Sequence, residues 1–552
     1  MKIVILGGYG VFGGRLAKLL ADMDGLEMVI CGRNPDRAQV FCEGFAGKAT
    51  VTPMRLDRLD IAAVLPQLKP DFVIDASGPF QDYGDDPYVV VKASIAAGVN
   101  YMDFADAADF VFGISQFDAA AAKARISVLS GVSSFPVLTA AVLREISKDL
   151  QIKSVRGGIA PSPYAGVGMN VIRAVVGYAG GPVKLYRGGK LTQAYGLAES
   201  LRYTVAVPGH MPLRNIRFSL VDVPDLQVIP PEHAGMEDIW MGAGPLPESL
   251  HRMLNMLAKL RAKLHLPSYA PLAPLFYRVL NLMKFGEHRG GMFIEAEGLQ
   301  DGQARSISWH MLAEGDDGPY IPSMAIEALI RKADVGDMPM PGARPATGAL
   351  EISDYDKLFD GRHIISGFRS EPVPESSLYK RVLGPAFEQL PAPVARLHAL
   401  DRERRWTGSA RVQRGRSILA RAIARLIGFP PGTDNIPVAV TLKPERDGER
   451  WIRQFGDAQF QSFQRPGQGR MTHLLEESFG MVTVALALVI KEGRLYLIPR
   501  HWRIFGVPMP KFLLPEGNSF EHADQGRFNF DVTIKVPLIG LIVSYQGFLK
   551  PV

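Results

Sequence analysis

The hydrophobic positions divide the chain into three stretches with different periods. From residue 3 to about residue 134, short apolar runs alternate with helical patterns, beginning with residues 3–6 and the helical pattern that follows them. Strands that alternate with helices in this way predict a parallel sheet. Residues 151–320 are less regular. From residue 378 onward, period-two segments follow one another with short connections, which is typical of an antiparallel sheet.

These patterns predict an α/β Rossmann-like parallel-sheet domain over residues 1–150, completed by about residues 314–368. An inserted α+β domain for substrate binding or dimerisation is expected over residues 151–313, including a helix at residues 169–178. Residues 369–376 are rich in proline and glutamate and predict a linker.

Residues 377–552 are expected to form a separate, mainly antiparallel β domain, curved into a barrel or cradle. A short connection at residues 491–493 marks one of its hairpins. Such strands either enclose a lipid-like ligand or pack into a solid module for dimerisation. The pattern leaves both alternatives open.

A glycine-rich turn follows the first strand. Gly8, Gly10 and Gly13 fit the dinucleotide fingerprint, whose glycines permit a sharp turn, close approach to a pyrophosphate and tight packing of helix on strand. Gly7, Gly10 and Gly13 fit a looser spacing equally well, so the register of the first glycine stays open. The alternative is a glycine-rich turn that binds nothing.

The helix that follows this turn begins near Val11 and Phe12. Its free amides and the positive end of its dipole predict contact with phosphates. The second strand, residues 27–31, ends at Gly32 and Arg33, with Arg37 one helical turn later. An NAD-selective fold usually places an acidic residue there, whereas a guanidinium matches the 2′-phosphate of NADP(H). We therefore predict NADP as the cofactor; a solvated arginine is the alternative.

Composition adds bounds to this picture. The chain has 552 residues, 47% of them hydrophobic and 21% charged, as in ordinary globular proteins of two or three domains. A net charge of +6 does not imply nucleic acid, and no nucleic-acid motif occurs. Two cysteines, Cys31 and Cys42, fit a reducing compartment, so a cytoplasmic protein is expected. The apolar run at residues 481–490 is too short to span a bilayer.

Three further motifs complete a family resemblance. They are Ser77-Gly78-Pro79-Phe80, Ala97-Gly98-Val99-Asn100-Tyr101-Met102-Asp103 and Gly131-Val132-Ser133-Ser134-Phe135-Pro136. Together with the glycine turn and Arg33, they resemble the saccharopine dehydrogenase-like oxidoreductases, well over residues 1–150 and weakly to about residue 350. The resemblance implies NADP(H) and hydride transfer without a defined substrate. The last third contains Trp451, Arg453 and Phe455, then Glu477, Phe479 and Gly480, and later residues 508–510 and 540–547. This pattern resembles an uncharacterised domain family found behind such reductases, which implies no activity.

The strand ends predict where the chemistry lies, because ligands of open α/β sheets bind outside the carboxyl ends of the strands. The nicotinamide is expected near Ser77, Gly78, Pro79 and Phe80 and near residues 131–136. Asp103 and Ser133 are the predicted catalytic residues, with Asp103 orienting substrate or relaying a proton. A helix cap or structural carboxylate is the alternative for Asp103. The absence of a G-x-S-x-G motif argues against hydrolase chemistry.

A basic amphipathic segment covers residues 251–289 and has a net charge of +6. It predicts contact with an anionic membrane surface, and packing on the protein core or on a homodimer partner is the alternative. Residues 401–425 form a second region of net charge +6, which suits phosphate, acidic lipid or an exposed helix and loop.

His473, Glu476 and Glu477 lack metal-ligand spacing, so no metal site is predicted. The best-supported function is an NADP(H)-dependent oxidoreductase acting on a hydrophobic or amine-bearing small molecule. The alternatives are a non-catalytic nucleotide sensor or lipid-binding protein at the membrane periphery, and a scaffold whose last domain recruits a partner.

Overall fold

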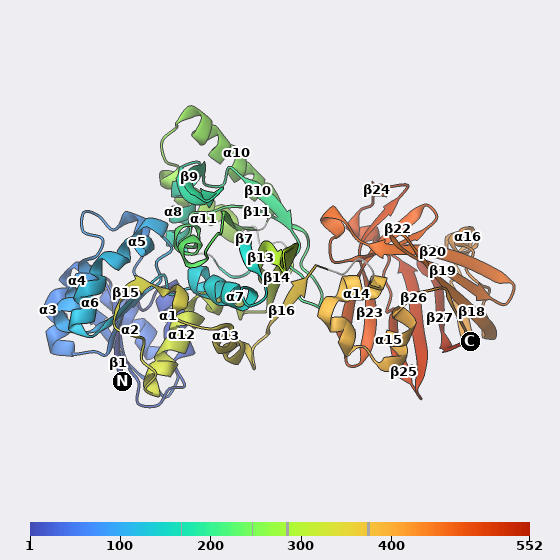
Figure 1. The fold of residues 1–552 in the computed structure, drawn as a ribbon, viewed down its shortest axis with the longest axis horizontal. Coiled ribbons are helices and arrows are strands. Elements are labelled where there is room, and N and C mark those ends of the chain that lie inside the picture. The colour runs from blue at the N-terminus through green and yellow to red at the C-terminus, as the bar shows by residue number, and fades with distance from the viewer. Residues whose placement is uncertain (167, 246, 283–285, 372–375) are drawn as a thin grey trace. The chain divides into compact units, whose positions relative to one another are not determined.

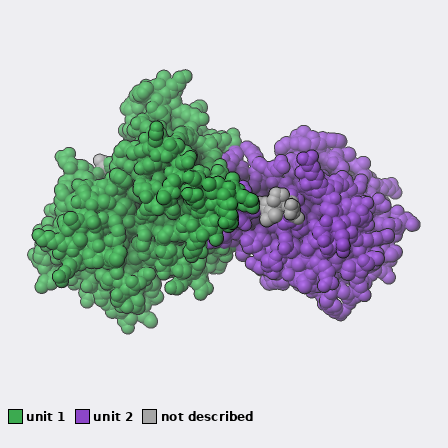
Figure 2. Space-filling view, in the orientation of Figure 1, with its two compact units in different colours: residues 1–201, 216–366 green, residues 202–215, 367–552 purple. Residues whose placement is uncertain are grey.

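The computed structural model describes residues 1–166, 168–245, 247–282, 286–371 and 376–552, so residues 372–375 of the predicted linker at 369–376 lie outside the described residues. The described chain forms two compact units (Figure 2). Unit 1 comprises residues 1–201 and 216–366, and unit 2 comprises residues 202–215 and 367–552.

A parallel sheet opens unit 1 and confirms the predicted Rossmann-like fold (Figure 1). Its strands lie in the order β15-β6-β5-β4-β1-β2-β3. Their bounds are β1 (Lys2–Leu6), β2 (Glu27–Gly32), β3 (Thr50–Arg55), β4 (Phe72–Asp75), β5 (Asn100–Asp103), β6 (Ser127–Ser130) and β15 (Gly342–Pro345). Strand β4 is buried along its whole length, as expected for a central strand covered on both faces.

Helices that precede the inserted segment in sequence and helices that follow it both cover the sheet. Helices α3, α4 and α6 share a hydrophobic core with β1, β2 and β4. Helix α12, which follows the inserted segment, packs on α1, where the Ser323 hydroxyl donates to the Phe12 carbonyl at 3.3 Å. The helix bounds are α1 (Val11–Leu19), α2 (Pro35–Glu43), α3 (Ile61–Leu68), α4 (Val89–Ala97), α5 (Ala108–Gly113), α6 (Asp118–Ala124), α7 (Thr139–Ile146), α12 (Ile321–Asp334) and α13 (Ile352–Phe359).

The inserted segment forms a mixed sheet together with β16, and its strand order is β10-β11-β12-β7-β13-β14-β16. Its strands are β7 (Gln151–Ala160), β10 (Ser200–Tyr203), β11 (Ile216–Leu220), β12 (Asp238–Ala243), β13 (Arg289–Gln300), β14 (Gln303–Glu314) and β16 (Ile364–Ser370). The remaining elements are the hairpin β8 (Pro182–Arg187) and β9 (Lys190–Tyr195), and helices α8 (Met169–Tyr178), α9 (Asp225–Val228), α10 (Glu248–Leu264) and α11 (Ala273–Leu282). Helix α8 has the bounds that its apolar period predicts.

Unit 2 is built on an antiparallel sheet that closes into a barrel, because β22 pairs with both β21 and β23. This confirms the predicted barrel. Its strands are β17 (Arg404–Arg414), β18 (Thr433–Glu445), β19 (Gly448–Phe455), β20 (Ala458–Pro466), β21 (Leu475–Phe479), β22 (Val482–Lys491), β23 (Arg494–Ile504), β24 (Val507–Pro508), β25 (Phe520–Asp524), β26 (Arg527–Val536) and β27 (Gly540–Pro551). Its helices are α14 (Leu378–Leu383), α15 (Ala392–His398) and α16 (Ile418–Ile427).

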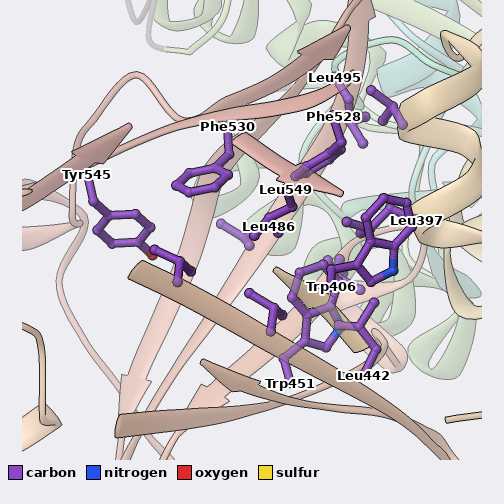
Figure 3. Close-up of a cluster of buried hydrophobic side chains, with 14 of the residues drawn as sticks. Leu397, Trp406, Leu442, Trp451, Leu486, Leu495, Phe528, Phe530, Tyr545 and Leu549 are labelled. Atoms are coloured by element: carbon purple, nitrogen blue, oxygen red, sulfur yellow. The ribbon is translucent and has the colours of Figure 1, made fainter. Parts of the chain in front are cut away.

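Large buried side chains fill the inside of the barrel (Figure 3). Trp406, Trp451 and Phe528 lie in one hydrophobic cluster with Phe530 and Tyr545, and each is less than 10% exposed. This packing corresponds to the solid module rather than to a cradle around a ligand.

Polar side chains also enter the barrel, in a row across β19, β20 and β21. Glu449 lies opposite Gln464, and Gln464 lies opposite Glu477. The Glu477 carboxylate accepts hydrogen bonds from Arg453 at 3.1 Å, Ser462 at 2.6 Å and Gln464 at 3.0 Å. A buried charge is tolerated only with such partners. The barrel therefore depends on the Arg453–Glu477 pair.

We predict that Arg453→Met lowers the free energy of unfolding by roughly 3–5 kcal/mol, because it leaves the buried Glu477 carboxylate without its counter-charge. Chemical denaturation of the full chain measures the change. Arg450→Met is the matched control on the same strand, since Arg450 pairs with the partly exposed Glu445 and its loss costs about 1 kcal/mol or less. Equal effects of the two substitutions would contradict a role for the buried pair.

Candidate nucleotide-binding cleft

A tight glycine turn joins β1 to α1. Gly7 has a φ of +70°, which favours glycine, and the Gly10 amide donates to the Gly7 carbonyl at 2.8 Å. A Cβ atom on Gly13 would stand 2.6 Å from the same carbonyl oxygen, and one on Gly8 would stand 2.9 Å from the Ile5 carbonyl oxygen. The glycines of both predicted registers therefore occupy positions that have no room for a side chain.

Helix α1 begins at Val11 with Gly10 as its N-cap, and within the described residues no side chain caps it. By contrast, the Asn34 side chain caps α2 by accepting from the Arg37 amide at 3.0 Å. The first amides of a helix have no partner within the helix. The start of α1 therefore offers free N–H groups and the positive end of a dipole to an anion.

The turn and the helix start line a cleft of about 830 Å³. It extends along the carboxyl ends of β1, β2, β3 and β4 and is closed on one side by α8. The residues that line it include Gly7, Tyr9, Gly10, Val11, Phe12, Arg33, Arg37, Asp57, Arg58, Ser77, Gly78, Pro79, Phe80, Tyr83, Phe104, Asp106, Ser133, Met169 and Arg173. Its length and position suit an extended ligand that crosses the glycine turn.

Arginines gather where β2 and β3 end. Arg33 and Arg37 are exposed in the cleft, and the Arg37 guanidinium lies 5.2 Å from the centre of the Tyr9 ring. Tyr9 is held in place because its hydroxyl accepts from the Asn34 amide at 3.0 Å. Arg58, which sequence reasoning missed, follows β3 and also lines the cleft, where it donates to the Tyr83 carbonyl. These cations suit a phosphate ester better than a free ribose hydroxyl.

A buried hydrogen-bond network supports the opposite wall. The Asp75 carboxylate is fully buried and accepts from the Ser77 hydroxyl at 2.5 Å and from the Tyr83 hydroxyl at 3.2 Å. Burial raises the pKa of Asp75, and burial followed by the Asp75 charge raises the pKa of Tyr83. The Arg58 guanidinium lies 3.9 Å from the centre of the Tyr83 ring. The network fixes Ser77 and Tyr83 at the cleft surface.

Two family models match this chain. Residues 3–129 match the saccharopine dehydrogenase NADP binding domain, and residues 390–549 match a domain of unknown function, DUF4166. The chain joins a saccharopine dehydrogenase-type NADP-binding domain to a DUF4166 domain. No curated protein matches it significantly.

Solved structures give weaker similarities. The saccharopine dehydrogenase (L-Glu forming) of Saccharomyces cerevisiae is 14% identical with a TM-score of 0.46, over 67% of this chain and 99% of that chain. The amine dehydrogenase of Mycobacterium smegmatis is 12% identical with a TM-score of 0.32, over 62% of this chain and 94% of that chain.

The predicted cofactor residues of the NADP-binding domain largely meet in the cleft. Gly7, Gly10, Val11, Phe12, Arg33, Arg37, Ser77, Gly78, Pro79 and Phe80 line it, whereas Gly8 and Gly13 pack behind the turn. Ser133, one of the predicted catalytic residues, lines the cleft as well.

The side chain of Asp103 does not line the cleft, where a residue that orients substrate or relays a proton would have to lie. Its carboxylate is fully buried. One oxygen, Oδ1, accepts from the Gly131 amide at 2.7 Å and from the Ala105 amide at 2.9 Å. This is the structural alternative: the carboxylate holds together the loops that follow β5 and β6, and it thereby positions the backbone near Ser133.

Another acid of the same loop, Asp106, lies three residues further along and lines the cleft, as does Asp57 after β3. Asp106 is exposed to solvent within the cleft and accepts from the Gln81 side chain at 3.1 Å. Surrounding protein nevertheless raises its pKa, since desolvation outweighs the Gln81 hydrogen bond. Sequence reasoning missed it because the loop after β5 contains several acids and its local pattern does not show which one turns outward.

Helix α8 supplies the wall opposite the glycine turn. Met169 and Val171 contribute apolar surface, and Arg173 contributes an exposed cation. The loop before α8 is tied to α1, because the Arg15 guanidinium donates to the Ala165 carbonyl at 3.0 Å. The helix was predicted, but its position over the cleft depends on the fold of the inserted segment.

His473 does not lie on a strand as predicted, because it has a φ of +68° in the turn before β21. In the described part of the chain, no group of three or more His, Cys, Asp or Glu side chains is arranged to hold a metal ion.

We predict that Asp103→Ala lowers the free energy of unfolding by roughly 2–5 kcal/mol, because two buried amides lose their acceptor. Asp103→Asn keeps a side-chain oxygen at the Oδ1 position and should cost about 1 kcal/mol or less. Chemical denaturation at neutral pH measures both changes. Equal losses would show that Asp103 does not act through these two hydrogen bonds.

The pKa of Asp103 also predicts how the free energy of unfolding depends on pH. Burial raises the pKa of Asp103 to about 7, above the roughly 3.9 of an unfolded aspartate. The folded state therefore holds the proton longer, and stability falls as pH rises between these values, by at most about 1.4 kcal/mol per pH unit for this group. Asp103→Asn should make that fall shallower.

Proposed function

We propose that this chain is an NADP(H)-dependent oxidoreductase that transfers hydride to or from a hydrophobic or amine-bearing small molecule. The observation that carries the proposal is the cleft, in which a side-chain-free glycine turn and an uncapped helix start lie next to an arginine cluster. The NADP-binding family model over residues 3–129 supports it.

The chain's own residues suit each part of the nucleotide. Free amides at the start of α1 suit the pyrophosphate. Arg33 and Arg37 suit the 2′-phosphate, and the Tyr9 ring offers an aromatic surface beside Arg37. Within the cleft lining, the end of β2 presents no carboxylate to repel that phosphate. When bound, the cofactor supplies the hydride.

The part of the cleft that Ser133 and Asp106 line is where substrate chemistry belongs. Ser133 offers a hydroxyl and Asp106 offers a carboxyl group to this part of the cleft, whereas the Tyr83 hydroxyl is engaged by Asp75. Because its pKa is raised, Asp106 keeps its proton to higher pH than an ordinary aspartate does, which suits a proton donor. When ionised, the same carboxylate suits a protonated amine.

The substrate classes follow from the lining of the cleft. Phe12, Phe80 and Phe104 present aromatic surface, and the Phe12 and Phe104 rings stack at 5.7 Å. Met169 and Val171 extend the apolar wall from α8. A hydrophobic carbonyl, imine or activated alkene would bury its apolar part here, while Asp106 favours a substrate that also carries an amine.

We predict that Arg33→Asp weakens NADPH binding by about 10-fold to 100-fold, because one charge-assisted contact is lost and a repulsive charge is added. NADH affinity should stay level or improve, since a carboxylate suits a free 2′-hydroxyl. Fluorescence titration of the full chain measures both affinities. Arg37→Ser should weaken NADPH binding in the same direction.

Lys357→Gln is the matched control, because this exposed cation lies on α13 and outside the cleft lining. Loss of NADH and NADPH affinity in equal measure would contradict the 2′-phosphate assignment. Tight NADPH binding without turnover of aldehydes, imines, amines or activated alkenes would favour the non-catalytic nucleotide sensor.

A second candidate function is docking on an anionic membrane surface, and the exposure pattern of α10 favours it. The helix packs through His251, Asn255 and Ala258, while Met253, Met256, Leu260 and Leu264 are 43–64% exposed and form one stripe along its outer side. The alternative was that the apolar face packs on the core: Leu254 and Leu257 do so, whereas the stripe itself stays uncovered within unit 1. In the described residues no helix is both long and apolar enough to cross a bilayer.

Some basic residues of this segment are engaged within the protein, and others are exposed to solvent. Arg261 is structural, because it donates to the Gly177 and Ala179 carbonyls at 2.7 Å each, and Arg252 pairs with Glu248. Lys259 and Lys263 are exposed beside the apolar stripe, and Arg278 is exposed on α11. Lys284 lies outside the described residues. We propose that Lys259, Lys263 and Arg278 carry the attraction to anionic lipid.

We predict that the triple substitution of Lys259, Lys263 and Arg278 by Gln weakens binding to phosphatidylglycerol-containing vesicles by about 100-fold, since each basic residue near the surface contributes ~1 kcal/mol. Vesicle flotation of the full chain measures it. The control removes the exposed Lys48, Lys123 and Lys357 in the same way. Equal flotation of the two variants would contradict a membrane role for α10.

A further inference from the structure

Helix α16, on the outside of the barrel in unit 2 (Figure 1), is packed with its small residues inward. Ala420 and Ala424 are buried at 0% and 1%, whereas Ile418, Leu419 and Leu426 are exposed at 79%, 62% and 70%. An amphipathic helix of a globular protein normally buries its large aliphatic residues. Ile423 and Ile427 pack partly against the barrel core, so the large aliphatic side chains that this helix presents to solvent are those of Ile418, Leu419 and Leu426.

The same outer side is cationic. Arg416, Arg421 and Arg425 are exposed, and from residue 404 to residue 433 the chain contains no Asp or Glu. The other nearby arginines are engaged: Arg414 donates to the Pro430 carbonyl at 2.7 Å, and Arg411 pairs with Asp434 at 2.9 Å. The exposed guanidiniums thus flank the aliphatic side chains without local carboxylates to neutralise them.

A second part of the chain adds to this surface. The turn between β26 and β27 lies at the start of α16, because the Ser417 hydroxyl donates to the Ile539 carbonyl at 3.1 Å. Leu538 in that turn is 94% exposed and has a φ of +68°, a conformation that suits glycine or asparagine better than leucine. Two segments more than a hundred residues apart therefore place large aliphatic side chains in solvent together.

We propose that these residues form a docking surface for an anionic lipid bilayer. We call it the α16 surface and define it as Ile418, Leu419, Leu426, Leu538, Arg416, Arg421 and Arg425. Exposed aliphatic side chains bordered by cations match the boundary between acyl chains and anionic headgroups. This gives the DUF4166 domain a role of its own, independent of the oxidoreductase cleft and of α10.

The charge arm of the test is Arg421→Gln with Arg425→Gln, and the apolar arm is Ile418→Ser with Leu426→Ser. Each double variant of the full chain is floated with vesicles of phosphatidylcholine alone and of phosphatidylcholine with phosphatidylglycerol. The parent should bind the anionic vesicles at least tenfold more tightly. Each arm should reduce that binding by about tenfold or more.

The experiment is repeated on the chain that already lacks Lys259, Lys263 and Arg278, which separates the α16 surface from α10. Matched controls are Lys48→Gln with Lys123→Gln, and Val335→Ser with Met340→Ser, since all four residues are exposed on unit 1. A thermal unfolding midpoint equal to that of the parent verifies folding. If the apolar arm fails to fold, the charge arm decides alone.

Unchanged vesicle binding of both arms in both backgrounds would overturn the proposal. A change of oligomeric state by light scattering, with vesicle binding unchanged, would also overturn it, because the surface would then contact a second copy of the chain. We expect these variants to keep their affinity for NADPH. The vesicle result can therefore be interpreted even if the chain proves not to be an oxidoreductase.

Discussion

The contact between the β1–α1 turn and the end of β4 is the constraint on which the first domain depends. A Cβ atom on Gly7 would stand 2.6 Å from the Ala76 carbonyl oxygen, and one on Gly13 would stand 2.6 Å from the Gly7 carbonyl oxygen. Because neither side chain exists, α1 starts directly above the strand ends and its amides reach the cleft. The walls of the cleft are then set by buried carboxylates, with Asp75 holding Ser77 and Asp103 holding the loops beside Ser133.

The two domains place their buried polar side chains differently. The parallel sheet has its buried carboxylates, Asp75 and Asp103, at the ends of β4 and β5, whereas the barrel encloses a row of charged and amide side chains around Glu477. On the surface, α10 and α16 share one arrangement, since each packs one side on a core and leaves further large aliphatic side chains exposed on the other. Exposed aliphatic area of this kind is costly in water, and a helix that carries it with cations is suited to an interface.

Much of this architecture follows from local pattern. The glycine turn, the bounds of α8 and the hairpin at residues 491–493 could be predicted, because each depends on spacing along one short segment. Strand β15 was missed because prolines around residue 341 hide its period, and β17 because its outward positions are largely arginine. The side chains of Asp103 and Asp106 could not be told apart, since which one faces the cleft depends on where β6 and its loop pack. The grouping of residues 202–215 with unit 2 is a purely tertiary fact.

The central claim is that Arg33 and Arg37, which follow β2, bind a 2′-phosphate. Isothermal titration of the full chain with adenosine 2′,5′-bisphosphate and with adenosine 5′-monophosphate tests it most directly, because the two ligands differ only in that phosphate. We expect the bisphosphate to bind about 10-fold to 100-fold more tightly and to compete with NADPH. Equal affinities, or binding of the bisphosphate that does not displace NADPH, would contradict the assignment of this cleft.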